Sequence, residues 1–414
     1  METMVTPSLG DSRIRSGLRH TVSDDSRIPE HIEGDPGMLF EAAGPRDLLY
    51  FNPKETVAAI VTCGGLCPGL NNVIRSLFFE LYYGYGVTEV FGFRGGYGGL
   101  DPACGIPPVK ITPGYVDGIH RQGGTILGTS RGPVDIARAV DHLIERGINI
   151  LFTVGGDGTQ RGANDIYQEA RKRGHPLSVV GVPKTIDNDV GFVSRTFGFV
   201  TAVEEAVRVL DCAHTEARST PGGIALVKLM GRHAGFITAG ATVASQDVNF
   251  ALIPEVPFSL EAFLSSLEKR MRYKSHAVIA VAEGAGQELL EADASKRDAS
   301  GNLKLGDIGH YLRGEIERHF KEKDIPVVMR YFDPSYQVRS RPANCQDSLL
   351  CDLFARNAVH AAMAGKTGVV IGLLHERFIH VPIELLKGHE KRVDPNSGWW
   401  RSVLATTGQP DPFV

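Results

Sequence analysis

The chain has 414 residues, of which 42% are hydrophobic and 22% charged, and its formal net charge is −4. This composition predicts a globular protein large enough for two α/β lobes, and the negative charge argues against a general nucleic-acid binder or membrane binder. Six cysteines, a polar amino terminus and the lack of a long apolar run lead us to expect a cytoplasmic protein without a signal peptide.

Residues 1–55 are rich in Ser, Asp, Pro and Gly and lack periodicity, so we expect an amino-terminal extension there. From residue 56 onward strand-like and helix-like segments alternate, which predicts parallel sheets with crossover helices. The predicted strands are 57–62, 89–93, 148–154, 178–182, 223–229, 249–253, 277–282 and 326–330. The predicted helices are 70–83, 134–146, 159–173, 233–244, 260–273, 308–322 and 347–364. The charged stretch 291–302 is expected to be an exposed loop.

These elements predict two Rossmann-like α/β lobes with helices on both faces of each sheet and the active site in the crevice between them. We expect the extension in 1–55, a phosphoryl-donor lobe in 56–195, an acceptor lobe in 196–382 whose later helices cross back, and a tail in 383–414.

The segment Gly155-Gly156-Asp157-Gly158-Thr159 follows an apolar strand and opens a helix. Glycines let backbone amides approach a phosphate closely, and the helix N-terminus adds partial positive charge. Asp157 is a suitable ligand for Mg²⁺, which prefers oxygen atoms. A Gly-Gly-Asp-Gly segment on its own can also be a simple tight turn.

A second motif, Pro183-Lys184-Thr185-Ile186-Asp187-Asn188-Asp189, follows the next apolar strand and supplies two more carboxylates. Such a triplet alone is usually a solvated turn or a helix cap. Because ligands bind where the strands of open α/β sheets end, the two motifs together indicate phosphoryl transfer.

Two further glycine-rich loops have the same character. Gly64 to Asn71 follows the first strand, and the loop that begins at Gly123 ends in Arg131-Gly132. A guanidinium there could neutralise a transferring phosphoryl group. The first loop is not the Gly-x-Gly-x-x-Gly fingerprint, so NAD is not implied.

Several later residues could hold an anionic or hydroxylated acceptor. A guanidinium binds phosphate through forked hydrogen bonds, and a carboxylate can accept hydrogen bonds from sugar hydroxyls. The candidates are Met230-Gly231-Arg232, Glu283 and Tyr336-Gln337-Val338-Arg339.

Taken in this order, these motifs resemble those of the 6-phosphofructokinase family over roughly residues 57–382. The resemblance implies an enzyme that phosphorylates fructose 6-phosphate at its 1-hydroxyl with ATP and Mg²⁺, the committing step of glycolysis. It also implies a homo-oligomer, either a dimer or a tetramer. The residues implied to hold the donor are Gly65, Arg131, Gly132, Gly156, Asp157, Gly158 and Thr159, with Asp157 also holding Mg²⁺. Asp187 would be the general base, and the acceptor would be held by Thr185, Ile186, Asp187, Met230, Gly231, Arg232, Glu283, Tyr336, Gln337, Val338 and Arg339.

Two positions bear on the donor. Diphosphate-using members of the family typically carry Asp where Gly158 stands, and a carboxylate there would crowd and repel the α-phosphate of ATP. Lys184 points the other way, because diphosphate enzymes have Lys where many bacterial ATP enzymes have Gly. The combination resembles the ATP-using branch of plants, trypanosomatids and some bacteria, so we expect ATP.

Alternatives remain open. The chain could be a diphosphate-dependent phosphotransferase, or a non-catalytic homologue that only binds sugar phosphate. Lipid and NAD kinases share Gly-Gly-Asp-Gly-Thr but lack the Thr-Ile-Asp-Asn-Asp context. Short bacterial enzymes carry an Arg that reaches a neighbouring subunit's sugar phosphate where this chain has Gly223, so binding across an interface is not implied.

Overall fold

The structure is a computed structural model that describes residues 2–290 and 304–411, and the predicted loop 291–302 lies outside them. The chain divides into two compact units. The first comprises Met1–Thr185, Val190–Gly198 and Ser340–Glu390, and the second Ile186–Asp189, Phe199–Arg339 and Lys391–Val414. Asp187 therefore belongs to the second unit, although the strand that precedes it belongs to the first.

A ten-stranded sheet organises the first unit, with the order β1-β4-β16-β15-β10-β9-β6-β7-β8 and β3 paired to β4. Its centre is parallel, whereas β16, β3 and β8 run antiparallel to their neighbours. The strands are β1 (Glu2–Thr3), β3 (Arg27–Pro29), β4 (Met38–Ala42), β6 (Val57–Thr62), β7 (Glu89–Phe93), β8 (Val109–Lys110), β9 (Ile150–Gly155), β10 (Ser178–Pro183), β15 (Val369–Leu374) and β16 (Arg377–Pro382). A separate pair joins β2 (Ile14–Arg15) to β5 (Leu48–Leu49).

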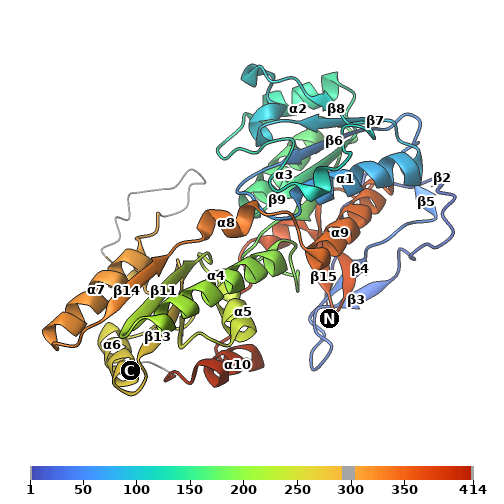
Figure 1. Ribbon diagram of the computed structural model, residues 1–414. Coiled ribbons are helices and arrows are strands. Elements are labelled where there is room, and N and C mark those ends of the chain that lie inside the picture. Colours follow the sequence, from blue (N-terminus) through green and yellow to red (C-terminus); the bar gives the residue numbers. More distant parts are fainter. Residues whose placement is uncertain (1, 291–303, 412–414) are drawn as a thin grey trace. The chain divides into compact units, whose positions relative to one another are not determined.

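Helices cover both faces of this sheet (Figure 1). Ala59 and Val61 of β6 pack in a cluster with residues of α2 and α3, while Ile60 points the other way and is also fully buried. On that second face α1 packs along α9, which contacts β10 and β15. The helices are α1 (Leu70–Phe79), α2 (Ile136–Glu145), α3 (Asp157–Lys172) and α9 (Cys345–Met363), with short turns η2 (Gly96–Leu100), η3 (Pro102–Cys104), η4 (Ile119–Arg121) and η6 (Ile383–Leu386).

The predicted helix 70–83 changes character before its end. α1 stops at Phe79 and continues as a π-helix, η1 (Glu80–Tyr85). Glu80 is 7% exposed and pairs with Arg356 of α9.

The amino-terminal extension contains strands that the sequence did not predict. β4 runs antiparallel to β16 and parallel to β1, and Phe40 of β4 is fully buried. The extension is therefore part of the first unit's sheet and core.

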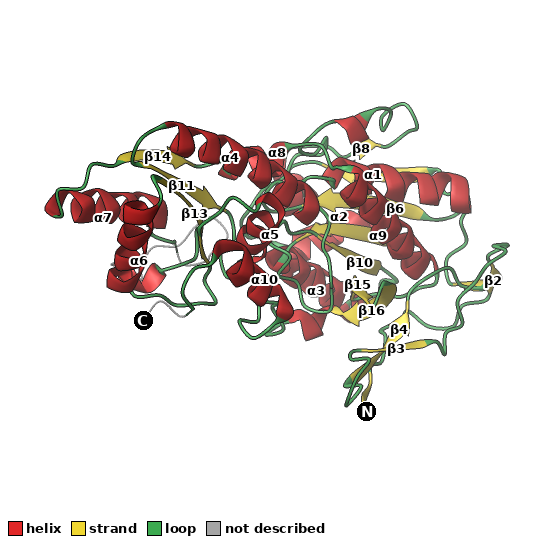
Figure 2. Ribbon diagram, turned by 60° about the horizontal axis from the view of Figure 1, so that its bottom comes forward, coloured by secondary structure: helices red, strands yellow, loops and turns green. Residues whose placement is uncertain are grey.

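The second unit is built on a parallel four-stranded sheet with the order β12-β13-β11-β14. Helices α4 and α5 pack on one side, and α6 and α7 share a cluster with Ile224 and Leu226 of β11 (Figure 2). The strands are β11 (Gly223–Leu229), β12 (Phe250–Leu252), β13 (His276–Ala282) and β14 (Val328–Phe332). The helices are α4 (Phe199–Ser219), α5 (Phe236–Ser245), α6 (Leu260–Tyr273), α7 (Ile308–Glu322), α8 (Ser335–Ser340), α10 (Gly398–Thr407) and the turn η5 (Gln287–Leu289).

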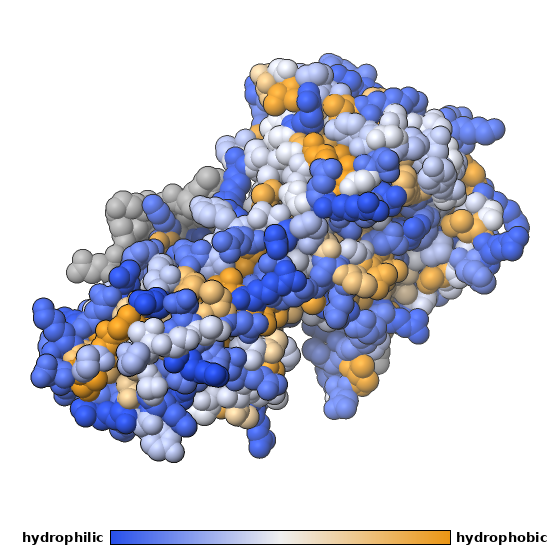
Figure 3. Space-filling view, in the orientation of Figure 1, coloured by the Kyte–Doolittle hydropathy of each residue, from blue (hydrophilic) through white to orange (hydrophobic). Residues whose placement is uncertain are grey.

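Hydrophilic residues cover much of the face shown in Figure 3, with apolar patches between them. Within the described residues, none of the helices combines the length and apolar composition that crossing a bilayer requires.

Candidate active site

Three motif loops begin at the same edge of the first unit's sheet. β6, β9 and β10 are adjacent parallel strands, so their carboxyl ends lie together. The loop Cys63–Gly69, the turn that opens α3 and the segment from Lys184 onward start there. This edge is where ligands bind in open α/β sheets.

The loop after β6 is held by the loop that carries Arg131. The backbone N–H of Gly64 donates to the Ser130 carbonyl at 3.1 Å, and the Thr129 hydroxyl donates to the Gly64 carbonyl at 2.7 Å. Arg131 and Gly132 lie just beyond these contacts and are exposed. The structure thus brings together the two loops that contain Gly65 and Arg131.

The turn at the start of α3 presents backbone amides of its first residues. Gly156 is the N-cap, its carbonyl accepts from the Thr159 N–H at 2.9 Å, and Asp157 is the first helical residue. Gly158 is exposed, and a Cβ built on it would meet only the Arg161 guanidinium, at 3.8 Å. The helix dipole and the free space next to Gly158 suit a polyphosphate.

A buried tyrosine, Tyr97, holds this turn in position through a hydrogen bond. Tyr97 of η2 is 8% exposed, and its hydroxyl donates to the Thr159 carbonyl at 2.6 Å. Burial raises the pKa of Tyr97 well above its usual value. The phenol therefore stays protonated and keeps its hydrogen bond.

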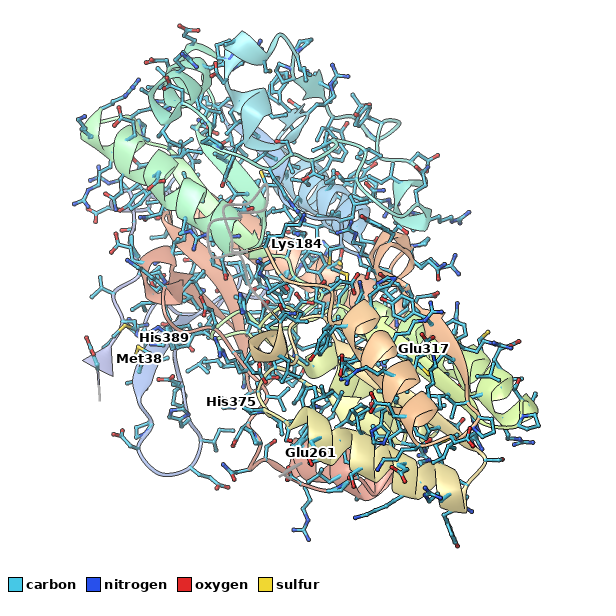
Figure 4. All side chains as sticks on the ribbon, turned by 90° about the vertical axis from the view of Figure 1, so that its left-hand side faces the viewer. Met38, Lys184, Glu261, Glu317, His375 and His389 are labelled. Carbon is cyan, nitrogen blue, oxygen red and sulfur yellow. The ribbon has the colours of Figure 1, made fainter. Side chains whose placement is uncertain are left out.

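Lys184 connects the two glycine loops. Its Nζ donates to the Gly65 carbonyl at 2.7 Å, and its backbone N–H donates to the Gly155 carbonyl at 3.1 Å. The residue is 7% exposed, and Figure 4 labels it among the stick side chains. Burial raises the pKa of the adjacent Cys63 thiol to about 12, an effect that the Lys184 ammonium opposes.

A closed loop follows Lys184. Lys184 pairs with Phe197 in a parallel bridge, and the Thr196 hydroxyl donates to the Thr185 carbonyl at 2.9 Å. Within the loop, Ile186 is 5% exposed while Asp187 is partly exposed. Asp187 is therefore accessible on a loop with fixed stems.

In the second unit the candidate acceptor residues also follow adjacent parallel strands. Met230, Gly231 and Arg232 follow β11, and Glu283 follows β13. The N–H of Glu283 donates to the Leu229 carbonyl at 2.8 Å, and that of Gly284 to the Gly231 carbonyl at 3.1 Å. Gly231 has φ 124°, a conformation that favours glycine.

Charge gathers around Glu283. Burial raises the pKa of Glu283, whereas the positive charges of Arg232, Lys228 and Arg339 act to lower it and Asp333 acts to raise it. This pattern places a carboxylate among cations, which suits a ligand with both hydroxyl and phosphate groups.

The α8 residues divide by exposure. The Arg339 guanidinium lies 4.7 Å from the centre of the Tyr336 ring, and Tyr336 is 76% exposed. Val338 is 1% exposed, so its side chain is part of the core and only its backbone could contact a ligand.

The sequence reasoning missed Lys228, which lies beside this acceptor set. Its ammonium pairs with Asp333 at 2.8 Å. Burial acts to lower the pKa of Lys228, but the negative charges of Asp333 and Asp307 raise it overall. The available signal was a lysine inside the otherwise apolar strand β11.

Gly223, the position that corresponds to the bacterial interface arginine, is buried at the start of β11. A side chain there would collide with the Ala217 carbonyl. This position therefore has no room for a side chain that could reach a ligand.

The donor-side residues fit a nucleotide bound with Mg²⁺. Among residues 2–290 and 304–411, no three His, Cys, Asp or Glu side chains gather as the ligands of one metal ion would. Mg²⁺ usually needs only one or two carboxylates together with phosphate oxygens and waters. Asp157, partly exposed beside the open turn, meets that requirement.

The comparisons with known proteins agree with these motifs. The family model described as Phosphofructokinase matches residues 57–362. An ATP-dependent 6-phosphofructokinase of Borreliella burgdorferi is 47% identical over 95% of this chain and 92% of its own length. One from Trypanosoma brucei brucei is 48% identical over 89% of this chain and 76% of its own.

A solved structure shares the fold. The pyrophosphate-dependent phosphofructokinase of Marinobacter aquaeolei aligns with a TM-score of 0.71 at 20% identity, covering 85% of this chain and 91% of that one. At this identity the likeness concerns the fold alone. The sequence matches, which span most of both chains, show that this chain belongs to the phosphofructokinase family.

Proposed function

We propose that this protein transfers the terminal phosphoryl group of ATP to the 1-hydroxyl of fructose 6-phosphate, giving fructose 1,6-bisphosphate and ADP. The observation that carries the proposal is the turn Gly155–Gly158 at the start of α3, which contains Asp157 and leaves space at Gly158. Relatives at 44–48% identity that bear the name ATP-dependent 6-phosphofructokinase support it.

On this proposal, the first unit binds the donor. The amides of Gly156 to Thr159 and of Gly65 hold phosphate oxygens, and Arg131 with Gly132 closes over them. Asp157 would hold Mg²⁺, which supplies charge neutralisation on the phosphate oxygens when it is bound. These roles correspond to a phosphoryl-donor part in 56–195.

Residues of the second unit bind the acceptor. Arg232 and Arg339 would bind the sugar phosphate, Glu283 would accept from sugar hydroxyls, and Met230, Gly231 and the exposed side of α8 would complete the site. Thr185, Ile186 and Asp187 would also hold the acceptor. These roles correspond to an acceptor part in 196–382.

Asp187 acts as the base. Its carboxylate accepts the proton of the 1-hydroxyl while that oxygen forms a bond to the terminal phosphorus, and the bond from that phosphorus to the bridging oxygen breaks to release ADP. Positioning and charge neutralisation provide most of the acceleration in such a reaction.

Diphosphate is the second candidate donor, and Lys184 is the observation that favours it. A coupled assay with ATP and with diphosphate as alternative donors tests the choice. The proposal requires efficient turnover with ATP, and turnover with diphosphate alone would refute it. We further propose a homo-oligomeric, cytoplasmic enzyme, which size-exclusion chromatography and cell fractionation would test.

A further inference from the structure

The loop that carries Asp187 has a third point of attachment besides its two stems. Its stems are joined by the Lys184–Phe197 bridge and the hydrogen bond from Thr196 to Thr185. Asp187 lies in the first half of this loop and Phe192 in the second half. The surroundings of Phe192 are therefore relevant to where the loop is held.

Phe192 adopts a backbone conformation that a bulky residue rarely takes. Its φ is 59°, in the left-handed region. Such a conformation is strained and persists only where the surroundings determine it strongly. Strained residues of this kind cluster at functional sites.

The surroundings of Phe192 come from the ends of the first unit's chain. Its ring is 8% exposed and lies 5.0 Å from the ring of Phe40 in β4 and 5.1 Å from that of His389. The other buried members of the cluster are Met4 and, in β16, Ile379 and Val381. Met38 packs against it, and Figure 4 labels Met38 and His389.

The backbone around Phe192 is also fixed. The Leu373 N–H donates to the Phe192 carbonyl at 3.0 Å, and the Ser194 N–H donates to the Leu373 carbonyl at 2.8 Å. A side chain on Gly191 would collide with the His389 carbonyl. The loop therefore has little room to shift away from β15.

β4 itself is anchored through its other face. Glu41, which follows Phe40, pairs with Arg46 at 2.8 Å and with Lys366 at 2.9 Å, and its carboxylate lies 3.3 Å from the His380 ring. Burial acts to raise the pKa of Glu41, but these three neighbours hold it well below its usual range. Successive residues of a strand point to opposite faces, so Phe40 is held against Phe192 while Glu41 binds the cations.

We propose that Phe40 and Phe192 are positioning residues for the transfer reaction. The Phe192 ring packs against Phe40 of β4, and this contact holds the loop that carries Asp187 in place. The inference rests on the proposed function, because it takes Asp187 as the base. It gives the amino-terminal segment a role in catalysis, although neither ring contacts the reacting atoms.

The test is a double-mutant cycle in the full-length enzyme, with Phe40→Leu, Phe192→Leu and the double variant. We expect each single variant to lower kcat roughly ten- to a hundredfold, because small displacements of a catalytic group cost that much, with the donor KM unchanged. The double variant should lose little more than either single one, because both break the same contact.

Phe378→Leu is the matched control. Phe378 lies on the neighbouring strand β16, and its ring pairs with Phe354 at 5.1 Å, away from the Phe192 cluster. Phe378 is half-buried, and this variant should leave kcat unchanged. If Phe378→Leu lowers kcat as much as Phe40→Leu does, or if the two losses in the cycle add fully, the rings serve stability alone and the inference is wrong.

Phe192→Gly separates the ring from the backbone. Glycine adopts a φ of 59° without strain, so this variant should keep the loop conformation but lose the ring contact with Phe40. We therefore expect kcat to fall in this variant too. Unchanged kcat would contradict the inference. If Phe40→Leu does not fold, Phe40→Met, which nearly conserves volume, replaces it in the cycle.

Asp187→Asn, measured in parallel, distinguishes the role of Asp187 as the base from the positioning role of the two rings. An inactive Asp187→Asn together with fully active ring variants overturns the positioning role alone. An active Asp187→Asn overturns the assignment of the base, and the positioning role with it.

Discussion

The Nζ atom of Lys184 donates a hydrogen bond of 2.7 Å to the carbonyl oxygen of Gly65. This contact joins the segment after β10 to the loop after β6. Lys184 therefore stabilises the donor-side loops, whichever donor is used. Its presence does not by itself select diphosphate.

Replacement of Lys184 by Met should weaken these loops. The change leaves the Gly65 carbonyl without its charged partner, and a hydrogen bond to a charged group contributes ~1.5–3 kcal/mol. We expect the free energy of unfolding to fall by about that amount and the donor KM to rise, as measured by denaturant titration and initial rates. Lys172→Met, at a side chain that is 80% exposed at the end of α3, should change neither quantity.

Replacement of Asp187 by Asn should remove the base and keep the shape of the side chain. A positioned base contributes typically ~10²–10⁴-fold to the rate. We expect kcat to fall by at least ~10²-fold with little change in the fructose 6-phosphate KM, because the interaction lost is one made in the transition state. A near-normal kcat in steady-state assays would show that another group takes the proton.

Replacement of Arg339 by Ala should weaken acceptor binding. Loss of a charge-assisted contact of ~1.5–3 kcal/mol raises the fructose 6-phosphate KM roughly ten- to a hundredfold and leaves the ATP KM unchanged. Arg330→Ala is the control, since Arg330 of β14 lies 3.6 Å from Glu216 and belongs to another contact. A rise in the ATP KM in place of the acceptor KM would mean that the roles are misassigned.

Glu283 should make acceptor binding depend on pH. Burial raises its pKa, opposed by Arg232, Lys228 and Arg339 and assisted by Asp333. Its ionised form accepts hydrogen bonds, so the acceptor KM should rise as the pH falls through this raised pKa, above the ordinary carboxyl range. Glu283→Gln should have a higher KM that no longer changes over this range, whereas Glu288→Gln, at an exposed position nearby, should follow the wild type. A KM profile that is the same in Glu283→Gln and the wild type would refute the role.

The elements whose bounds were predicted correctly are those whose ends are marked by the residues next to them in the sequence. α6 and α7 begin and end where predicted, because Ser259 and Asp307 cap their first turns and apolar residues follow with helical spacing. β6, β7 and β11 also have their predicted bounds, since they are short apolar runs flanked by turn residues.

What the sequence did not reveal depends on contacts between distant segments. α4 was missed because small residues such as Ala206 and Ala213 form its buried side and give little hydrophobic contrast. β4 and β16 pair across most of the chain, and Phe192 packs against Phe40 and His389, which are both far from it in the sequence. The motif residues of each unit, Arg232 and Arg339 among them, could be placed from the sequence, but the position of Lys228 beside Glu283 required the structure.

The most direct measurement of the central claim is kcat/KM for ATP and for diphosphate, in the wild type and in Gly158→Asp. Gly158 is exposed and open enough for a carboxylate, which would lie close to the α-phosphate of ATP. Two like charges ~4 Å apart repel by ~4 kcal/mol at an effective dielectric of 20, which would weaken ATP up to roughly a thousandfold. We predict that the wild type prefers ATP and that the variant loses ATP-driven turnover without a matching loss with diphosphate. A wild type that prefers diphosphate, or a variant with full ATP activity, would contradict the account.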